Sequence, residues 1–308
     1  MSNEQRHVAV LLGGWSLERE VSLASGEACA KALEEAGYRV TKVDVTRDLA
    51  ATLKALSPDV CFNALHGPFG EDGCVQGLLE ILEIPYTHSG VLASSLAMDK
   101  NLAKKMMAAV GVPVALSKIA RRGETALGHL MPPPYVVKPV ADGSSFGIYI
   151  VGPEMKAPPG DKILSDGDED DPMMVEEYVA GLELTCAVMG DRALDIIEIR
   201  PEGSHDFYDY EAKYAEGGSQ HILPAEISSN IYQLIQKYSL EAHNALGCRG
   251  VSRADFRYDP ETETLVCLEI NTQPGMTATS LVPEIAERAG YSFNELVRWI
   301  VEDASCNR

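Results

Sequence analysis

The first 90 or so residues alternate between short apolar runs and amphipathic segments. The apolar runs cover 7–12, 38–45 and 59–65, and the helical patterns cover 21–36 and 75–82. The first run stops at Gly13-Gly14, and Gly37 is placed to close the first helix. Buried strands that alternate with helices are typical of an open, mostly parallel sheet with helices on its faces. The opening of the chain therefore predicts an α/β unit.

The rest of the chain has a different order of elements, which predicts α+β architecture and three units: 1–93, 94–177 and 178–308. Helices are predicted over 94–110 and 228–246 and twice near the C-terminus, with strands at 135–139, 173–179, 183–188 and 193–199 and a hairpin over 251–271. The segment 156–172 is expected to be a loop or a poor helix, and 205–221 a long polar loop.

Charge and composition exclude several classes of function. With 26 basic and 46 acidic residues the formal charge is −20, so no nucleic-acid or anionic-membrane partner is expected, and an anionic ligand must meet a few local cations. No apolar stretch approaches the roughly 20 residues of a membrane span. Seven scattered cysteines without a CxxC pair argue against a disulfide framework and a structural zinc site. We expect a cytoplasmic protein.

The hairpin over 251–271 carries polar side chains at alternate positions. Arg253 and Asp255 share a face of one strand, and Glu269 and Asn271 share a face of the other. A turn centred near Thr262 would place Asp255 opposite Glu269 and Arg253 opposite Asn271. Facing carboxylates repel unless a cation lies between them, and Asp, Glu and Asn oxygens suit Mg²⁺. A solvated hairpin face is the alternative interpretation.

A lysine followed by a glycine-rich loop predicts a phosphate site. Lys138 ends an apolar strand, and Gly143, Ser144, Ser145 and Gly147 follow it. Glycines let backbone N–H groups approach an anion closely. The P-loop pattern GxxxxGK[ST] and the dinucleotide pattern GxGxxG are both absent, and an ordinary hairpin turn is the alternative.

Four further polar residues stand where ligands bind in such folds. Lys100 and Lys213 could supply local cations, although surface lysines are common. Glu18 and His66 each follow a predicted strand, where open α/β sheets bind ligands, although a histidine there is more often a hydrogen-bonding loop residue. Together with the hairpin and the glycine loop, these residues predict a nucleotide-dependent enzyme with its site between units.

Six segments, found in one order along nearly the whole chain, resemble the D-alanine–D-alanine ligase family of the ATP-grasp superfamily. They read GGWSLEREVSL, ALHGPFGEDG, PYTHSGVLASSLAMDK, VVKPVADGSSFG, EGSHDFYDYEAKY and LEINTQPGMTATSLVP. The resemblance implies an ATP-grasp fold behind an N-terminal α/β domain. It also implies ATP as co-substrate and two Mg²⁺ ions, with Mn²⁺ as a possible substitute.

The resemblance assigns roles at the nucleotide. It implies that Asp255, Glu269 and Asn271 bind the metals, with Glu269 bridging both. The predicted phosphate contacts are Lys100, Lys138, Lys213 and the loop residues Gly143, Ser144 and Ser145. Glu176, Glu177 and Val179 match a linker that reads adenine through backbone groups, and Glu183 matches a ribose contact. Glu177 stands where lysine is frequent in the family.

Further matches concern D-alanine. Glu18 matches the residue that holds the first D-alanine's ammonium, with His66 beside it. Arg253 and the Gly275 N–H resemble an oxyanion site, and Ser280 and Leu281 lie at the second D-alanine. Tyr214 and Ser144 match partners of Glu18 in a hydrogen-bonded trio.

The implied reaction joins two D-alanine molecules through a D-alanyl phosphate, for peptidoglycan precursor synthesis, and the family is usually a homodimer. A D-alanine–D-lactate ligase is one alternative. Tyr214 argues against it, because lactate-using relatives typically carry a different residue at this position. The other is a nucleotide-binding module that has lost catalysis.

Overall fold

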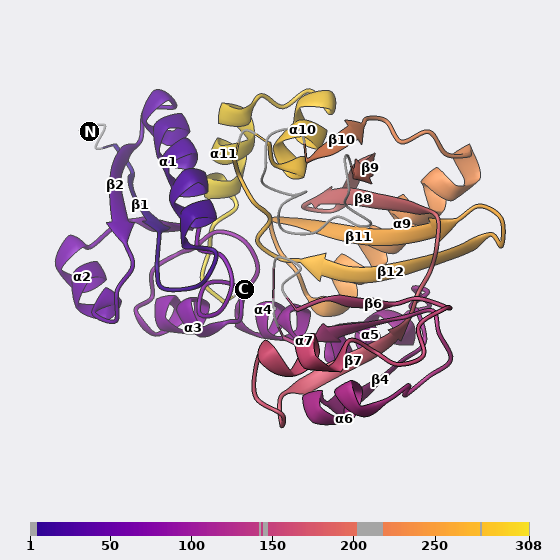
Figure 1. Cartoon of the computed structure of the whole chain (residues 1–308). Helices are drawn as coiled ribbons and strands as arrows, with labels where there is room; N and C mark the ends of the chain where they lie inside the picture. Colours follow the sequence, from indigo (N-terminus) through magenta and orange to yellow (C-terminus); the bar gives the residue numbers. More distant parts are fainter. Residues whose placement is uncertain (1–4, 142, 144–146, 202–217, 278, 308) are drawn as a thin grey trace.

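The computed structural model describes residues 5–141, 143, 147–201, 218–277 and 279–307, and Figure 1 shows their arrangement. Three sheets lie one after another along the chain, and the fold class is α/β with antiparallel sheets in the later parts, as predicted. Among the described residues, no helix combines the length and the apolar character that crossing a bilayer requires.

The first sheet is parallel and has the order β2-β1-β3. Its strands are β1 (His7–Leu12), β2 (Arg39–Asp44) and β3 (Val60–Asn63), and its helices are α1 (Arg19–Glu35), α2 (Leu49–Leu56) and α3 (Cys74–Ile81). Every residue of β1 is buried because it is the central strand, which is why its sequence is apolar without alternation. Gly37 has φ of 90°, as a glycine that follows a helix end often does. The prediction missed α2.

The second sheet is antiparallel, in the order β4-β7-β5-β6. It comprises β4 (Ser117–Arg121), β5 (Tyr135–Pro139), β6 (Tyr149–Val151) and β7 (Pro172–Glu177), with helices α6 (Arg122–Leu127) and α7 (Gly160–Ser165). A small core that includes Tyr135, Val137, Ile163 and Met173 holds the helices against the sheet. The short helix α7 lies within 156–172, where a loop or a poor helix was expected.

The third sheet is also antiparallel, in the order β10-β9-β8-β11-β12. Its strands are β8 (Leu182–Met189), β9 (Arg192–Pro201), β10 (Ser219–Ile222), β11 (Val251–Asp259) and β12 (Thr264–Asn271), and α9 (Ser229–Leu246) packs on it. The loop predicted over 205–221 was wrong at its end, because Ser219, Gln220 and His221 pair with β9. The earlier part of that segment lies outside the described residues.

The helix predicted over 94–110 is two helices, α4 (Val91–Met98) and α5 (Lys100–Ala109). Asp99 separates them with an extended backbone, and its carboxylate accepts the N–H groups of Asn101 and Leu102 to cap α5. Both helices pack against α9 and β12, where Ala97 and Met107 join the core of the third sheet.

The C-terminal helices, α10 (Leu281–Arg288) and α11 (Phe293–Glu302), return the chain to its beginning. Helix α11 packs on α1, and one core contains Val8 of β1, Val251 of β11 and Ile300 of α11. The predicted boundary at 177/178 directly follows β7, whereas the one at 93/94 falls within α4. The three-unit division remains a prediction.

Candidate active site

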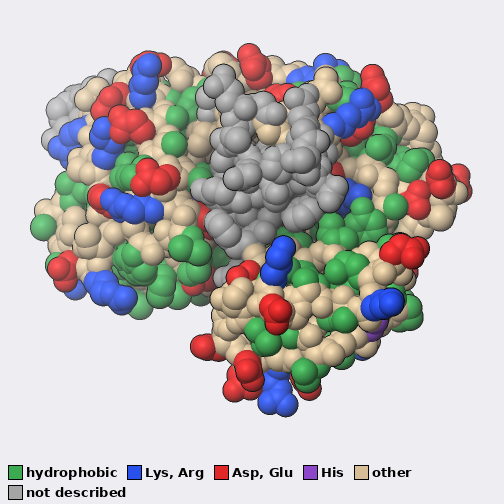
Figure 2. Space-filling view, in the orientation of Figure 1, with side chains coloured by type: hydrophobic (Ala, Val, Ile, Leu, Met, Phe, Trp, Pro, Cys, Tyr) green, Lys and Arg blue, Asp and Glu red, His purple; other side chains and the backbone are tan. Residues whose placement is uncertain are grey.

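A cavity between the second and third sheets collects residues from every part of the chain. The predicted site residues that line it are Glu18, Lys100, Lys138, Gly143, Glu176, Glu177, Val179, Glu183, Arg253, Asp255, Glu269, Asn271, Gly275, Ser280 and Leu281. Figure 2 shows hydrophobic side chains gathered in the recess where the upper and lower parts of the molecule meet on the right of the view. Ser144, Ser145, Lys213 and Tyr214 lie outside the described residues.

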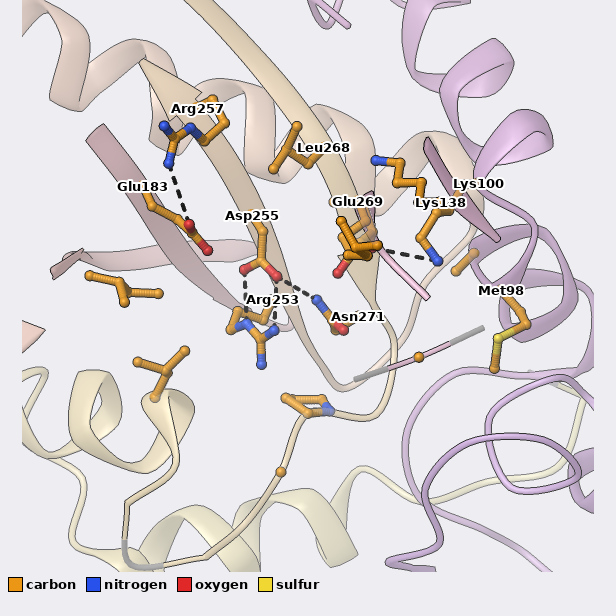
Figure 3. Close-up of a pocket in the computed structure, with 18 of the residues that line it drawn as sticks. Met98, Lys100, Lys138, Glu183, Arg253, Asp255, Arg257, Leu268, Glu269 and Asn271 are labelled. Atoms are coloured by element: carbon orange, nitrogen blue, oxygen red, sulfur yellow. Dashed lines mark hydrogen bonds and ion pairs between the residues drawn. The ribbon is translucent and has the colours of Figure 1, made fainter. Parts of the chain in front are cut away.

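The predicted register of the hairpin is confirmed. Asp255 pairs with Glu269 and Arg253 pairs with Asn271 across β11 and β12. Beyond this pair the register shifts, so that Phe256 faces Cys267 and Leu268 is an extra residue. Leu268 also lines the cavity, and Figure 3 shows it beside Asp255 and Glu269. The hairpin therefore presents an apolar side chain next to its carboxylates.

Asp255 is the centre of a hydrogen-bonded cluster at the base of the cavity (Figure 3). Arg253 donates from Nε to Oδ1 at 2.9 Å and from Nη2 to Oδ2 at 2.8 Å. The amide of Asn271 donates to Oδ2 at 2.9 Å, and the hydroxyl of Thr185 on β8 donates to Oδ1 at 2.6 Å. These bonds fix the carboxylate in the orientation that faces Glu269.

The oxygen atoms of this cluster are suitable ligands for Mg²⁺. Asp255 and Glu269 provide carboxylate oxygens and Asn271 an amide oxygen, on adjacent strands of one cavity wall. No group of three or more His, Cys, Asp or Glu side chains forms a metal site within the described ranges. Mg²⁺ needs no such group, because it keeps few protein ligands and completes its shell with phosphate oxygens and water.

Two lysines share one buried carboxylate at the other side of the cavity. Lys138 Nζ donates to Glu176 Oε2 at 2.6 Å, and Lys104 Nζ donates to Glu176 Oε1 and to the carbonyl of Ala115. Burial alone would raise the pKa of Glu176, but Lys138 and Lys104 outweigh it and lower that pKa. The two lysines and Glu176 together carry a net positive charge and are all buried, which favours binding of a polyanion.

Lys100 provides a further cation next to the hairpin. Its Nζ is 3.9 Å from Glu269 Oε2, and Figure 3 shows Lys100 and Lys138 on the same side of Glu269. The sequence prediction missed Lys104, which lies one helical turn after Lys100 on α5. That i, i+4 spacing was the available signal.

The N-terminal unit contributes Glu18, which lies at the N-terminus of α1 and is buried. Its Oε2 is so close to Gly67 and Gly143 that an added Cβ would come within 2.6 Å and 3.0 Å of it, respectively. The backbones of the first sheet's loop and of the glycine-rich loop therefore meet at this carboxylate.

His66 is not among the described residues that line the cavity; its neighbour Glu71 is. The His66 ring contacts Glu71 Oε1 at 2.9 Å through Nδ1 and Ser25 Oγ at 3.2 Å through Nε2. The prediction placed His66 beside the substrate and missed Glu71, although both belong to the loop 66–73 that follows β3.

The loop after β12 is fastened to the first sheet and to itself. Gln273 accepts from Asn63 Nδ2 and donates to the carbonyl of Leu65. Ser280 Oγ accepts from the N–H of Thr277 at 2.9 Å and would lie 2.9 Å from a Cβ at Gly275. The prediction did not identify Gln273, because its partner is more than 200 residues away.

Comparison with known proteins identifies the family. Residues 100–302 match the family described as D-ala D-ala ligase C-terminus, and residues 48–89 match the one described as D-ala D-ala ligase N-terminus. The chain belongs to the D-alanine–D-alanine ligase family.

Individual members of the family are similar over the full chain. The D-alanine–D-alanine ligase of Xanthobacter autotrophicus is 62% identical over 306 residues, which cover 98% of this chain and 99% of the relative. The Bacillus anthracis D-alanine–D-alanine ligase complexed with ATP is 29% identical, with a TM-score of 0.79 over 97% of both chains. The VanG D-Ala:D-Ser ligase of Enterococcus faecalis is 30% identical, with a TM-score of 0.78 over 97% of this chain and 99% of that one.

Membership of the D-alanine–D-alanine ligase family agrees with the architecture. The second and third sheets form an ATP-grasp fold, preceded by the open α/β domain of the first sheet. The chain is thus an enzyme of the ligase class by descent, and its candidate active site lies where the two sheets of the ATP-grasp fold meet.

Proposed function

We propose that this chain ligates two D-alanine molecules to D-alanyl-D-alanine with ATP, by way of a D-alanyl phosphate, to supply peptidoglycan precursors. One observation carries the proposal: Asp255, Glu269 and Asn271 share a single cavity with Lys100 and Lys138. Oxygen atoms that can bind metal ions, together with cations in the same cavity, suit a nucleoside triphosphate and its metals. Glu18, Gly275 and Ser280 extend the same cavity toward the first sheet.

The first step needs neutralisation of phosphate charge. Lys138 and Lys100 are proposed to bind ATP phosphates while the carboxylate of the first D-alanine attacks the γ-phosphate in line. Lys138 is held at Glu176, so little reorganisation is required when the nucleotide binds. Two Mg²⁺ ions, held by Asp255, Glu269 and Asn271, would add electrostatic stabilisation of the transferring phosphoryl group.

The second step needs an activated carbonyl and an oxyanion site. A carboxylate is a poor acyl donor, so the acyl phosphate must form first. Arg253, oriented by its paired bonds to Asp255, and the N–H of Gly275 are proposed to stabilise the tetrahedral oxyanion as the second D-alanine's amine attacks. Phosphate then leaves.

Binding of the two amino acids is assigned to the end of the cavity near the first sheet. Glu18 is a buried carboxylate in the cavity lining and is proposed to hold the ammonium of the first D-alanine. Ser280 and Leu281 begin α10 at the same end and are proposed to contact the second D-alanine. Ser144 and Tyr214 are proposed to complete a trio with Glu18.

The proposal extends to assembly, location and domains. Ile81 of α3 and Val91 and Leu92 of α4 are exposed, Ile81 to 80% and Leu92 to 69%, which favours a homodimer through this apolar surface. The seven cysteines are free thiols, as suits a reducing cytoplasm that supplies ATP. We retain three units, 1–93, 94–177 and 178–308.

The decisive experiment measures ADP release and product formation with D-alanine, D-lactate, D-serine and L-alanine. We expect ADP release that depends on D-alanine and yields D-alanyl-D-alanine. Turnover only when D-lactate is present would identify a depsipeptide ligase instead. ATP binding without D-alanine-dependent ADP release would identify a module that has lost catalysis.

A further inference from the structure

Arg257 lines the candidate active site on the same strand face as Asp255, yet no role follows for it from the proposed reaction. It lies on β11 directly opposite Glu183 of β8. Its Nη1 is 3.4 Å from Glu183 Oε2, and its Nε donates to the carbonyl of Val179 at 3.0 Å. The guanidinium carbon also lies 5.8 Å from the ring centre of Tyr178. One side chain thus contacts Tyr178 and Val179 of the segment that joins β7 to β8, and Glu183 at the start of β8.

The joining segment is packed tightly against the end of β11. Gly181 has φ of +87°, and an added Cβ there would come within 2.2 Å of the Tyr258 carbonyl. Glycine is needed here for both its conformation and its size. The segment is therefore fixed in one position against β11, and Arg257 contacts it at Val179 and Tyr178.

The charges along the cavity explain why a cation is needed here. Glu177 and Glu183 bring two carboxylates to the lining of this end, whereas Glu176 is paired with Lys138 and Lys104. Among the described lining residues, Lys100 and Lys138 lie near Glu269, and Figure 3 shows Arg257 and Glu183 on the opposite side of Asp255 from these two lysines. Arg257 offsets the repulsion that the carboxylates would otherwise exert on one another.

We propose that Arg257 is a positioning residue for the nucleoside: it orients the Glu183 carboxylate toward ribose hydroxyls and holds the Val179 backbone in place for the base. This rests on the proposed function, in which ATP occupies the cavity with its ribose at Glu183. Both side chains are mostly buried, with 16% and 17% of the side-chain surface exposed, so their pairing is little screened. Discrimination of ribose from deoxyribose would then depend on Arg257.

The test compares binding of ADP and 2′-deoxy-ADP by calorimetry with turnover of ATP and 2′-deoxy-ATP. We expect Arg257→Met to weaken ADP binding about tenfold, in line with loss of a charge-assisted hydrogen bond, and to abolish the preference for the ribose nucleotide. The KM for D-alanine should stay within about twofold, since the amino acid binds elsewhere. Arg257→Lys should restore part of the preference, because it keeps the charge but not the fork of donors.

Two controls separate positioning from folding. Arg298→Met removes an exposed arginine–glutamate pair on α11, which does not line the cavity, and should leave both nucleotide affinities unchanged. Glu183→Gln should abolish the preference for the ribose nucleotide, as Arg257→Met does. The double variant should lose no more ADP affinity than either single variant.

The inference is overturned if Arg257→Met keeps the wild-type preference, or if the wild-type protein binds both nucleotides equally. Calorimetry detects either outcome without turnover. Failure of the ligase proposal would appear separately, as absence of D-alanine-dependent ADP release in a protein that still binds ADP.

Discussion

Asn63 and Gln273, 210 positions apart in the sequence, share a buried hydrogen bond of 2.6 Å. Asn63 ends β3, and Gln273 lies two residues before Gly275 in the loop after β12. Gln273 also donates to the carbonyl of Leu65, next to His66. One glutamine thus connects the loop of the proposed oxyanion site to the first sheet, next to the proposed site of the first D-alanine.

Gln273→Met is expected to uncouple these two parts. The buried amide of Asn63 keeps its bond to Gly70 but loses its partner in Gln273, so the free energy of unfolding should fall by about 1–3 kcal/mol. A loosened loop should let water reach the acyl phosphate, raising the ratio of ADP to dipeptide released. Gln236→Met removes a similar hydrogen bond, from a side-chain amide on α9 to the Leu194 carbonyl of β9, and should leave that ratio at one. An unchanged ratio in the Gln273 variant would contradict the coupling.

Glu269→Gln tests the proposed metal site. The substitution keeps shape and removes the charge opposite Asp255, so turnover should fall at least about a hundredfold, as for other losses of transition-state electrostatics. The melting temperature should stay near the wild-type value, because Glu269 is partly exposed. Glu27→Gln, at an exposed pair with Lys42, is the matched control. Near-normal activity, measured as D-alanine-dependent ADP release, would refute the assignment.

Lys104→Met tests the shared carboxylate. Glu176 would then pair with Lys138 alone, which neutralises the cation proposed to meet phosphate, and the KM for ATP should rise. The loss of a buried ionic partner should also lower the free energy of unfolding by about 3 kcal/mol in urea titrations. Adding Glu176→Gln should recover part of the nucleotide affinity by releasing Lys138. If the KM for ATP is the same as in Lys237→Met, an exposed-pair control, the prediction fails.

His243 predicts a pH dependence of stability. It is 2% exposed, and burial lowers its pKa from 6.5 to about 4, with Ser252 Oγ 2.7 Å from Nδ1. The unfolded chain therefore takes up a proton near pH 6.5, while the folded chain does so only near pH 4. The free energy of unfolding should fall as pH drops through that window, by up to about 1.4 kcal/mol per unit. The free energy of unfolding of His243→Gln, measured in urea between pH 7 and 5, should depend less steeply on pH than that of the wild type, by the equivalent of one proton. Equal slopes in the two proteins would show that His243 is not the cause of the pH dependence.

Local patterns in the sequence determined the kinds of element and the chemistry they carry. Alternation along two strands predicted that Asp255 faces Glu269, because side chains repeat every two residues in a strand and a short turn allows few registers. The unbroken apolar run of β1 predicted a buried parallel strand. Family resemblance then supplied roles that periodicity alone could not.

Only the tertiary structure decided which distant groups meet. The helix predicted over 94–110 breaks at Asp99, and both halves pack on the third sheet. Arg257 reaches Val179 and Glu183, Lys104 reaches Glu176, and Gln273 reaches Asn63. These pairs are 72 to 210 residues apart in the sequence. Such contacts follow from how whole sheets and helices pack, and no short stretch of sequence contains that information.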